Sequence, residues 1–278
     1  MRIRATVAAV SGALVLSAFA VPAAQAADAS SGKAALSSAT STAAATLNVT
    51  FSKMKVNSGK AVVVGATAKV AVPVTYTLTH AAGLDVSADN FASGPLIYRG
   101  TSATSFTKRI ISDDPGTCTA ASTTVLNCKA TIYIRPTSDL ANADATTWKA
   151  GGLAISANGA TKTQSDLGSV PVKRLSQLTA DATPEPVKKG NTITVTGKLS
   201  RANWETNKYA GYASQPVKLQ FRKNGSSTYT TVKTITTSST GTLKTTVKAT
   251  VDGYFRYSFA GTSTTPAVNA TGDYVDVK

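Results

Sequence analysis

The sequence predicts an all-β protein that consists of two β-sandwich domains in tandem, placed after a cleaved signal peptide and a flexible tether. Two observations carry this prediction. From Leu47 onward, short runs rich in valine and threonine alternate apolar with polar residues, and turn-forming residues separate the runs. Helical periodicity is scarce along the same stretch, and regularly spaced short strands are typical of sandwiches.

The first 26 residues are typical of a secretory signal peptide. Met1 to Arg4 is positively charged, Val7 to Ala20 is apolar, and Ala24-Gln25-Ala26 is a small-x-small cleavage site. A membrane anchor is the competing interpretation, but it needs about 20 uninterrupted apolar residues, and polar or breaking residues interrupt this run. We expect cleavage after Ala26 and a secreted, soluble chain, because no second hydrophobic segment follows.

The charge balance favours anionic partners. The chain has 29 Lys and Arg against 14 Asp and Glu, a net charge of +15. Without the signal peptide the net charge is +13, and the part from Lys173 onward carries +9 of it. A field of this sign attracts cell-wall polymers, acidic polysaccharides, nucleic acid or lipid head groups, although surface lysines can also serve only solubility.

Residues 27–46 are rich in alanine, serine and threonine and cannot bury enough apolar area to order themselves, which predicts a flexible tether. Residues 47–172 are expected to form the first sandwich. Pro73 within the third run predicts an edge position or a bulge there. The expected strands are 47–51, 60–64, 68–78, 95–99, 105–111, 124–135, 152–157 and 169–173.

The two cysteines, Cys118 and Cys128, are expected to form a disulfide, because an exported chain meets an oxidising environment. The ring would be short, so the bridge would tighten one hairpin and would not hold the whole domain together. A redox or catalytic thiol is the alternative, but no CxxC pair is present.

The second domain is expected to span residues 173–278, after a proline-containing passage around Pro184 and Pro186. Asn224-Gly225 is a hairpin signal between two alternating runs. Seven strands at this spacing fit an immunoglobulin-like sandwich. The clearest runs are 192–199, 217–222, 229–236, 242–251, 254–259 and 274–277.

The same region resembles a known group of domains. The order GNTITVTGKL, PVKLQFRKNGSSTYTTVKTITTSSTGT, DGYFRYSFAG and GDYVDV is similar to bacterial immunoglobulin-like domains at the C-termini of secreted actinobacterial proteins. The resemblance implies the fold, whereas such domains serve as spacers, adhesive modules or appendages to enzymes. Residues 47–172 resemble no particular family.

The sequence shows few of the residue combinations that enzyme catalysis needs. His80 is a lone histidine, and the two glutamates, Glu185 and Glu205, show no spacing that pairs carboxylates across a cleft. No G-x-S-x-G nucleophile motif with partners is present. We therefore expect no catalysis. An enzyme with a catalytic N-terminal domain stays an alternative, because that domain is unassigned.

A calcium-binding module is a further alternative, and no other cofactor is indicated. Some proteins with this general appearance are described as calcium-binding, but an acidic loop of the D-x-[DN]-x-[DN]-G form is absent here. Aspartates in Asp-Pro and Asp-Gly sequences are also ordinary turn formers. The candidate ligands are Asp113, Asp114, Asp252, Asp273 and Asp276.

The candidate binding loop is the long segment from Arg201 to Gln215. It holds Trp204, Tyr209 and Tyr212, and Tyr229 is expected in or near the same end of the sandwich. The flat apolar faces of these rings suit sugar stacking, and long loops on a rigid sandwich often bind ligands. Alternatively, Trp204 fills the core. The sequence thus predicts a secreted, extracellular or wall-associated structural or binding protein that binds anionic or glycan polymers, with no specific nucleic-acid module and no prediction of oligomeric state.

Overall fold

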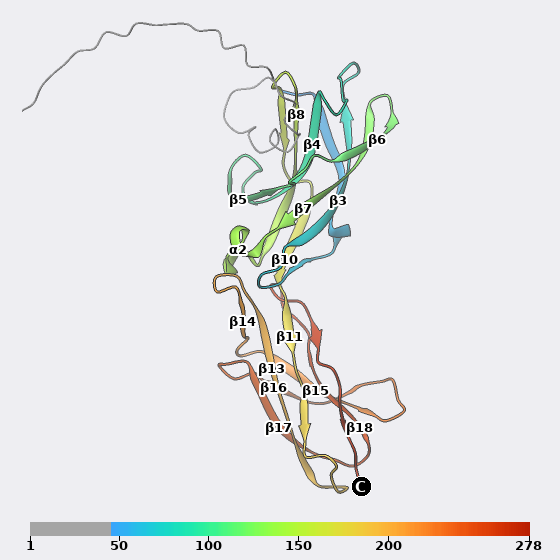
Figure 1. The fold of residues 1–278 in the computed structure, drawn as a ribbon, viewed down its shortest axis with the longest axis vertical. Helices are drawn as coiled ribbons and strands as arrows, with labels where there is room; N and C mark the ends of the chain where they lie inside the picture. The colour runs from blue at the N-terminus through green and yellow to red at the C-terminus, as the bar shows by residue number, and fades with distance from the viewer. Residues whose placement is uncertain (1–45) are drawn as a thin grey trace, which may run out of the picture. The chain divides into compact units, whose positions relative to one another are not determined.

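The computed structural model describes residues 46–278. The predicted signal peptide and the predicted tether up to residue 45 lie outside the described residues, and Thr46 forms a parallel bridge with Thr161. Residues 46–278 contain twenty strands, the short helix α2 (Pro136–Asp139) and the 3-10 turns η1 (Asn57–Gly59) and η2 (Asn142–Asp144) (Figure 1). The all-β prediction is therefore confirmed.

The first sheet has the order β1-β3-β7-β6, and every neighbouring pair is antiparallel. Strand β3 shows the alternation that the sequence predicts, because Val72, Val74, Tyr76 and Leu78 are buried and the residues between them face outward. The strands are β1 (Val49–Val56), β3 (Val70–His80), β6 (Thr117–Ser122) and β7 (Val125–Ile134).

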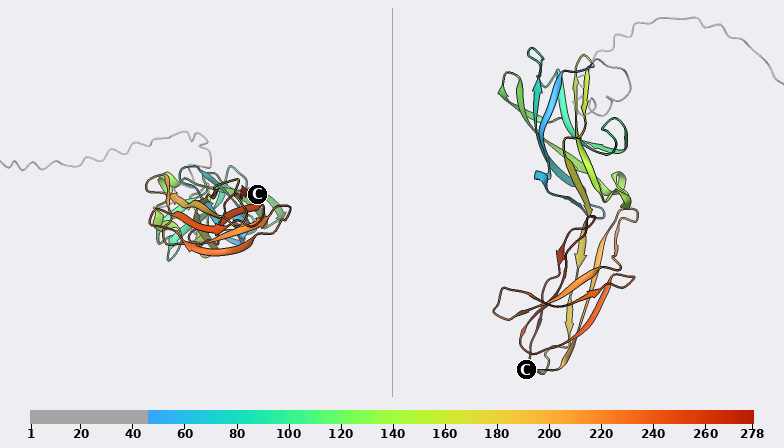
Figure 2. Two further views of the ribbon diagram at one scale, coloured as in Figure 1. Left: turned by 90° about the horizontal axis from the view of Figure 1, so that it is seen from below. Right: turned by 180° about the vertical axis from the view of Figure 1, so that it is seen from behind.

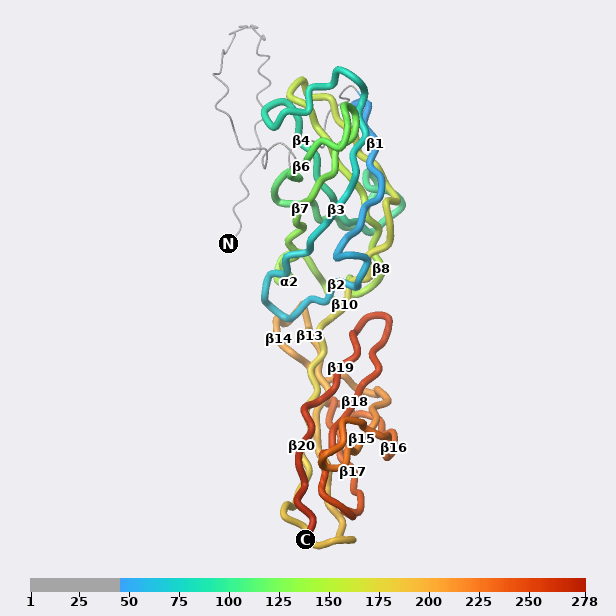
Figure 3. The backbone as a smooth tube through the Cα atoms, turned by 90° about the vertical axis from the view of Figure 1, so that its right-hand side faces the viewer, coloured from blue at the N-terminus to red at the C-terminus, as the bar shows by residue number. Residues whose placement is uncertain are grey.

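The second sheet has the order β2-β10-β8-β4-β5, and β9 pairs with β8. Strand β2 runs parallel to β10, and the two lie side by side in Figure 3. The strands are β2 (Val62–Val64), β4 (Phe91–Gly100), β5 (Phe106–Ile111), β8 (Thr147–Ser156), β9 (Thr161–Gln164) and β10 (Ser169–Arg174).

These two sheets form an immunoglobulin-like sandwich. Strands β1, β3, β7 and β6 occupy the places A, B, E and D of a constant-type sheet, and β4, β8 and β10 occupy C, F and G. Trp148 on β8 is fully buried between the sheets. The sequence predicted a sandwich here but did not indicate the immunoglobulin-like strand order.

The third and fourth sheets form a second sandwich, immunoglobulin-like as predicted. Strands β11, β12, β14 and β17 all pair with the long strand β13, and the opposite sheet has the order β16-β15-β18-β19 with β20 also on β18. The first of these sheets contains β11 (Ser176–Leu178), β12 (Asp181–Thr183), β13 (Thr192–Asn203), β14 (Lys208–Gly211) and β17 (Thr242–Lys248). The second contains β15 (Pro216–Lys223), β16 (Thr230–Thr236), β18 (Gly253–Phe259), β19 (Val268–Asn269) and β20 (Asp273–Val275) (Figure 2).

The core of the second sandwich lies between β13 and β18. Tyr257 is fully buried, and its hydroxyl donates a hydrogen bond of 2.8 Å to the carbonyl of Val195 on the opposite sheet. Gly197 lets the two sheets approach, since a Cβ there would lie 2.7 Å from the Tyr257 ring. Gly197 is thus a site of close packing between the two sheets.

One expectation about the chain path needs correction. Pro73 does not lie on an edge strand, because β3 runs between β1 and β7; β1 pairs with it only as far as Val74, so the proline faces no β1 partner. Strand β10 ends at Arg174 and β11 begins at Ser176, close to the expected boundary at Lys173. The division into two separate domains remains a prediction.

Candidate functional site

Five aromatic and basic side chains gather on the outer face of the sheet that contains β15, β18 and β20. We call them the arginine–tyrosine face: Arg222, Tyr229, Tyr254, Arg256 and Tyr274. Alternation explains their direction, because the neighbouring residues Phe255, Tyr257 and Phe259 on β18 are buried. Register brings them together, since Tyr254 lies opposite both Arg222 and Tyr274.

The rings and guanidinium groups of this face are stacked on one another. The Arg222 guanidinium carbon lies 4.0 Å from the Tyr254 ring centre and 5.4 Å from that of Tyr229. The Arg256 guanidinium carbon lies 3.7 Å from the Tyr229 ring centre. Tyr254 and Tyr274 pack with ring centres 5.1 Å apart. Cation–π contacts of this kind fix the two guanidinium planes.

Tyr229 reaches the face from the β15–β16 hairpin, which projects from the sheet in orange in Figure 2. Its hydroxyl lies directly over Gly272, where an added Cβ would come within 2.1 Å of the hydroxyl oxygen. The absence of a side chain at Gly272 therefore gives Tyr229 its place. Asn224-Gly225 makes the tight turn of this hairpin, with Gly225 at a φ of 78°.

Hydrogen bonds hold both guanidinium groups and leave donors available. Arg256 Nε donates to the Gln220 side-chain oxygen at 2.9 Å, and Arg222 donates to the Ser226 carbonyl at 2.5 Å. The remaining N–H groups can bind the paired oxygens of a carboxylate, sulfate or phosphate. Hydrogen bonding with Tyr229 raises the pKa of Arg222, so this group stays cationic.

Tyr274 marks the end of the face that lies nearer to acidic residues. Partial burial, followed by the nearby carboxylates of Asp252 and Asp276, raises the pKa of Tyr274 above its usual value. The ring therefore remains a neutral phenol at physiological pH. An anionic ligand is better placed toward Arg222 and Arg256, away from these carboxylates.

The predicted binding loop is not a single loop, because β13 extends to Asn203 and β14 occupies Lys208–Gly211. Trp204 is only 2% exposed and packs in the core cluster of the first sandwich, and its indole N–H donates to the Gly65 carbonyl at 2.9 Å. Tyr209 packs partly buried against the same cluster. Trp204 is thus a packing residue with no ring face open to a sugar.

The other two residues of the predicted loop also have internal partners. The Arg201 guanidinium carbon lies 3.8 Å from the Tyr212 ring centre, and the guanidinium approaches the hydroxyl of Thr265 at 3.3 Å. Tyr212 packs edge-on against Phe259 with ring centres 5.9 Å apart. The structure therefore brings Arg201 and Tyr212 together and separates this pair from Trp204 and Tyr209.

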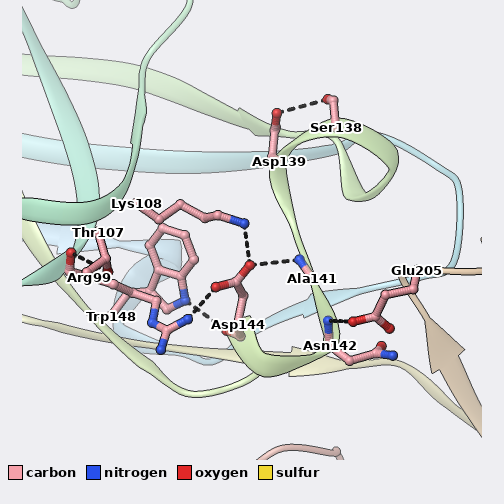
Figure 4. Close-up of polar contacts among 10 residues, drawn as sticks. All are labelled: Arg99, Thr107, Lys108, Ser138, Asp139, Ala141, Asn142, Asp144, Trp148 and Glu205. Carbon is pink, nitrogen blue, oxygen red and sulfur yellow. Dashed lines mark hydrogen bonds and ion pairs between the residues drawn. The ribbon is translucent and has the colours of Figure 1, made fainter.

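The hairpin that carries Trp204 meets a polar network around Asn142 (Figure 4). Glu205 accepts a hydrogen bond from the Asn142 backbone N–H at 2.7 Å. The Asn142 side chain accepts from the Trp204 backbone N–H at 3.0 Å and donates to the Asn203 side chain at 2.9 Å. These bonds fix the β13–β14 turn to the segment that follows α2.

Asp144 is the centre of the same region (Figure 4). Its carboxylate is 3% exposed, binds Arg99 and Lys108, with the lysine at 2.5 Å, and accepts from the Ala141 N–H at 2.7 Å. Its carbonyl accepts from the Trp148 indole at 2.9 Å. Burial alone would raise the pKa of Asp144, but the hydrogen bonds from Ala141, Lys108 and Arg99 hold it below its usual value. No pattern in the sequence indicated this buried charge.

Four of the five candidate calcium ligands have partners within the chain. Asp113 pairs with Arg135, and Asp276 lies 3.3 Å from the Lys278 amine. Asp252 accepts from the Val277 N–H at 2.8 Å, and Asp273 from the Ala182 N–H at 2.6 Å. Asp114 is exposed beside Pro115. Within residues 46–278, no three histidine, cysteine or acidic side chains gather as a metal site.

The predicted disulfide is present. Cys118 and Cys128 lie directly opposite each other on β6 and β7, with Cα atoms 4.1 Å apart. The bridge therefore joins neighbouring strands of one sheet, and it does not connect the two sheets of the sandwich. Strand β6 itself was not among the predicted strands.

His80, the lone histidine of the chain, lies in the protein interior and contacts the backbone. His80 is 7% exposed, at the end of β3, and its Nδ1 lies 3.0 Å from the Ala81 carbonyl. In the part of the chain that the structure describes, no helix is long and apolar enough to cross a membrane.

No protein-family model matches the sequence, and no curated protein matches it either. Among solved structures, the chain is similar to the D00-D0 domain of intimin, at 16% identity over 80% of this chain and 98% of that one, with a TM-score of 0.27. It is also similar to the adhesin InvE of Yersinia pseudotuberculosis, at 14% identity over 82% and 58% of the two chains, with a TM-score of 0.26. An I-band fragment of titin matches at 11% identity over 84% and 67%, with a TM-score of 0.32. The immunoglobulin-like assignment rests on the strand order of this chain.

Proposed function

We propose that this protein is a secreted, extracellular or wall-associated binding protein without catalytic activity, and that it binds anionic groups of a polymer or glycan through the arginine–tyrosine face. The observation that carries the proposal is a pair of guanidinium groups, Arg222 and Arg256, held in place by tyrosine rings with N–H donors still available. Within residues 46–278, neither group forms an ion pair with a carboxylate.

The chemistry of the face suits this role. A fixed guanidinium presents a planar fork of donors that matches a carboxylate, sulfate or phosphate. Because rings and strands already hold Arg222 and Arg256, binding an anion costs little further side-chain entropy. The net charge of +9 from Lys173 onward adds a general attraction toward polyanions.

Secretion is part of the same proposal. It is supported by the charged, apolar and small-residue pattern of residues 1–26 and by the disulfide between Cys118 and Cys128, which suits an oxidising compartment. The resemblance of the C-terminal region to domains of secreted actinobacterial proteins agrees with this location.

Retention on immobilised polymer tests the proposal. The chain from Ala27 onward is applied to beads that carry polygalacturonate, a linear polymer of uronic acid, and to beads that carry neutral dextran. We expect retention on polygalacturonate at low salt, release at high salt because exposed charges are screened, and passage through dextran. No retention on polygalacturonate at low salt would refute the proposal for acidic glycans.

A further inference from the structure

The first sandwich carries a second polar surface, on the outer face of its sheet β1-β3-β7-β6. Thr75 and Thr77 on β3 face away from the core, because Val74, Tyr76 and Leu78 between and beside them are buried. Their cross-strand neighbours on β7 are also outward and polar, with Thr75 opposite Lys129 and Thr77 opposite Asn127. Strand β6 extends the row, since Thr119 lies opposite Asn127.

This surface is hollowed. Two adjoining hollows of about 290 Å³ and 490 Å³ share Thr75 and Lys129 as lining residues. We call the combined hollow the threonine trough. Its outward lining side chains are Lys53, Thr75, Thr77, Thr117, Thr119, Asn127, Lys129, Thr131 and Tyr133, with Pro73, Asp114 and Pro115 at one end.

The backbone places Lys53 at the trough through a bulge. The pairing of β1 with β3 shifts between Ser52 and Lys55, and Lys53 has a φ of 50°, in the left-handed region that a lysine rarely adopts. Bulges re-aim side chains, and strained residues of this kind gather at binding sites. Within the same bulge, Met54 packs partly buried against the core between Phe51 and Val56, while Lys53 is exposed.

Two lysines line the trough, Lys53 in the first hollow and Lys129 where the two hollows meet. In the described part of the first sandwich, the ion pairs engage Arg99, Lys108, Arg135 and Lys149. Lys53 and Lys129 are in none of them and are exposed. The acidic lining residue, Asp114, belongs to the second hollow with Pro73 and Tyr133, where the Lys69 amine packs over the Tyr133 ring. An anion therefore fits near Lys53 and Lys129, and a neutral hydroxyl-bearing group fits near Asp114.

Hydroxyl and amide groups fill the space between the charges. The Thr77 hydroxyl donates to the Asn127 side-chain oxygen at 3.2 Å, which turns the amide N–H groups away from Thr77, and the Thr119 hydroxyl donates to the Asn127 carbonyl at 3.3 Å. Facing residues on neighbouring strands repeat about every 5 Å, and outward residues along a strand about every 7 Å. The Cys118–Cys128 bridge holds β6 against β7 beneath this array. The result is a rigid lattice of donors and acceptors.

We propose that the threonine trough is a second binding surface, for a segment of an acidic polysaccharide whose anionic groups contact Lys53 and Lys129 and whose hydroxyls bond to the threonines and Asn127. Sugar hydroxyls both donate and accept hydrogen bonds, as threonine hydroxyls and the asparagine amide do. Single-stranded nucleic acid is disfavoured because it stacks bases on open rings, and Tyr133 already carries the Lys69 amine at 4.3 Å from its ring centre.

A second surface changes how the protein holds a polymer. A chain that binds one polymer molecule at two places converts the second contact into an intramolecular step, so the overall affinity exceeds that of either surface. The disulfide, whose Cys128 is buried in the core beneath the trough, supports the trough from below.

The test uses the chain from Ala27 onward and measures its Kd for soluble polygalacturonate. We expect the variant K53Q/K129Q to bind between about twofold and thirtyfold more weakly, because an exposed charge pair contributes roughly 0.2–1 kcal/mol. The matched control is K60Q/K162Q, which removes two cations of the same sandwich that lie outside the trough. Equal Kd values for the two variants would overturn the inference.

A second pair of variants separates a polysaccharide site from general charge attraction. T77V/T119V keeps shape and charge but removes two hydroxyls, so we expect weaker binding of polygalacturonate and unchanged binding of inorganic polyphosphate. An unchanged Kd for polygalacturonate would overturn the polysaccharide assignment, and so would tighter binding of single-stranded DNA than of polygalacturonate. The outcome is independent of the arginine–tyrosine face, because changes there leave the comparison of K53Q/K129Q with K60Q/K162Q intact.

Discussion

At the residue scale, Asp144 is the most buried charged residue in the part of the chain that the structure describes. Its carboxylate is almost fully enclosed, while the side chains of Arg99 and Lys108 are each 34% exposed. Removing one member of a buried ionic cluster leaves the others without compensation. Asp144 therefore stabilises the folded state through its charge. The hydrogen bond from the buried Trp148 indole to the Asp144 carbonyl holds this residue against the core.

We predict that Asp144→Asn lowers the free energy of unfolding by about 1–3 kcal/mol, less than for a fully enclosed pair because water reaches both cations. Urea denaturation at neutral pH measures the change. Asp166→Asn is the control, because that aspartate pairs with Lys149 while 61% exposed and should change stability much less. Equal effects of the two substitutions would contradict this role of Asp144.

The same residue gives a pH dependence. Its folded pKa is below the unfolded value, so its stabilisation is present above the ordinary carboxyl pKa of about 3.9 and is lost as pH falls through the lower, folded pKa. The acid-induced loss of stability below about pH 4 should therefore be smaller in Asp144→Asn than in the natural sequence.

At the scale of elements, the β6–β7 hairpin depends on its disulfide. We predict that replacing both Cys118 and Cys128 with alanine lowers the free energy of unfolding by about 2–3 kcal/mol, because the ten-residue separation closes only a small loop. Thermal unfolding with and without reductant checks this, since reductant should destabilise the natural sequence and leave the alanine variant unchanged. A reductant effect on the variant would contradict the explanation.

The β13–β14 hairpin depends on Trp204. Trp204→Phe keeps an aromatic ring but leaves the Gly65 carbonyl without the indole donor, so we predict a loss of about 1–3 kcal/mol. Lys208→Gln on the same hairpin is exposed and serves as the control. If chemical denaturation showed the same stability for both variants, Trp204 would not have the structural role assigned to it.

Sequence patterns predicted strands well where alternation was strong, as in β3, β15 and β18, because one face of each strand is buried. They missed β6, β9, β11, β12, β14 and β19, which are short or polar and depend on neighbouring strands for their pairing. Trp204 was ambiguous, because a tryptophan suits both a binding loop and a core.

Tyr229 is the one member of the arginine–tyrosine face that the sequence indicated as a candidate binding residue. Its other members come together through cross-strand register, which places Tyr254 between Arg222 and Tyr274. Register depends on the complete sheet, and no local spacing shows it. The burial of Asp144 could not be predicted from local sequence either, because its partners Arg99 and Lys108 are 45 and 36 residues away in the sequence.

At the scale of the whole molecule, binding of an extracellular polymer requires export of the chain. We predict that the protein recovered from the medium of a secreting bacterial host begins at Ala27, because Ala24-Gln25-Ala26 is a cleavage site for signal peptidase. N-terminal sequencing or intact mass checks this. A full-length protein that begins at Met1 and stays with the cells would contradict the export proposal.

The central claim is that Arg222 and Arg256 bind anionic groups of a polymer. The most direct measurement is the Kd for polygalacturonate of R222Q/R256Q against that of K198Q/K208Q, which removes two exposed cations from the opposite sheet of the same sandwich. We predict that R222Q/R256Q binds at least about tenfold more weakly than K198Q/K208Q, because fixed guanidinium groups contribute more than flexible surface lysines. Equal Kd values for the two variants would contradict it.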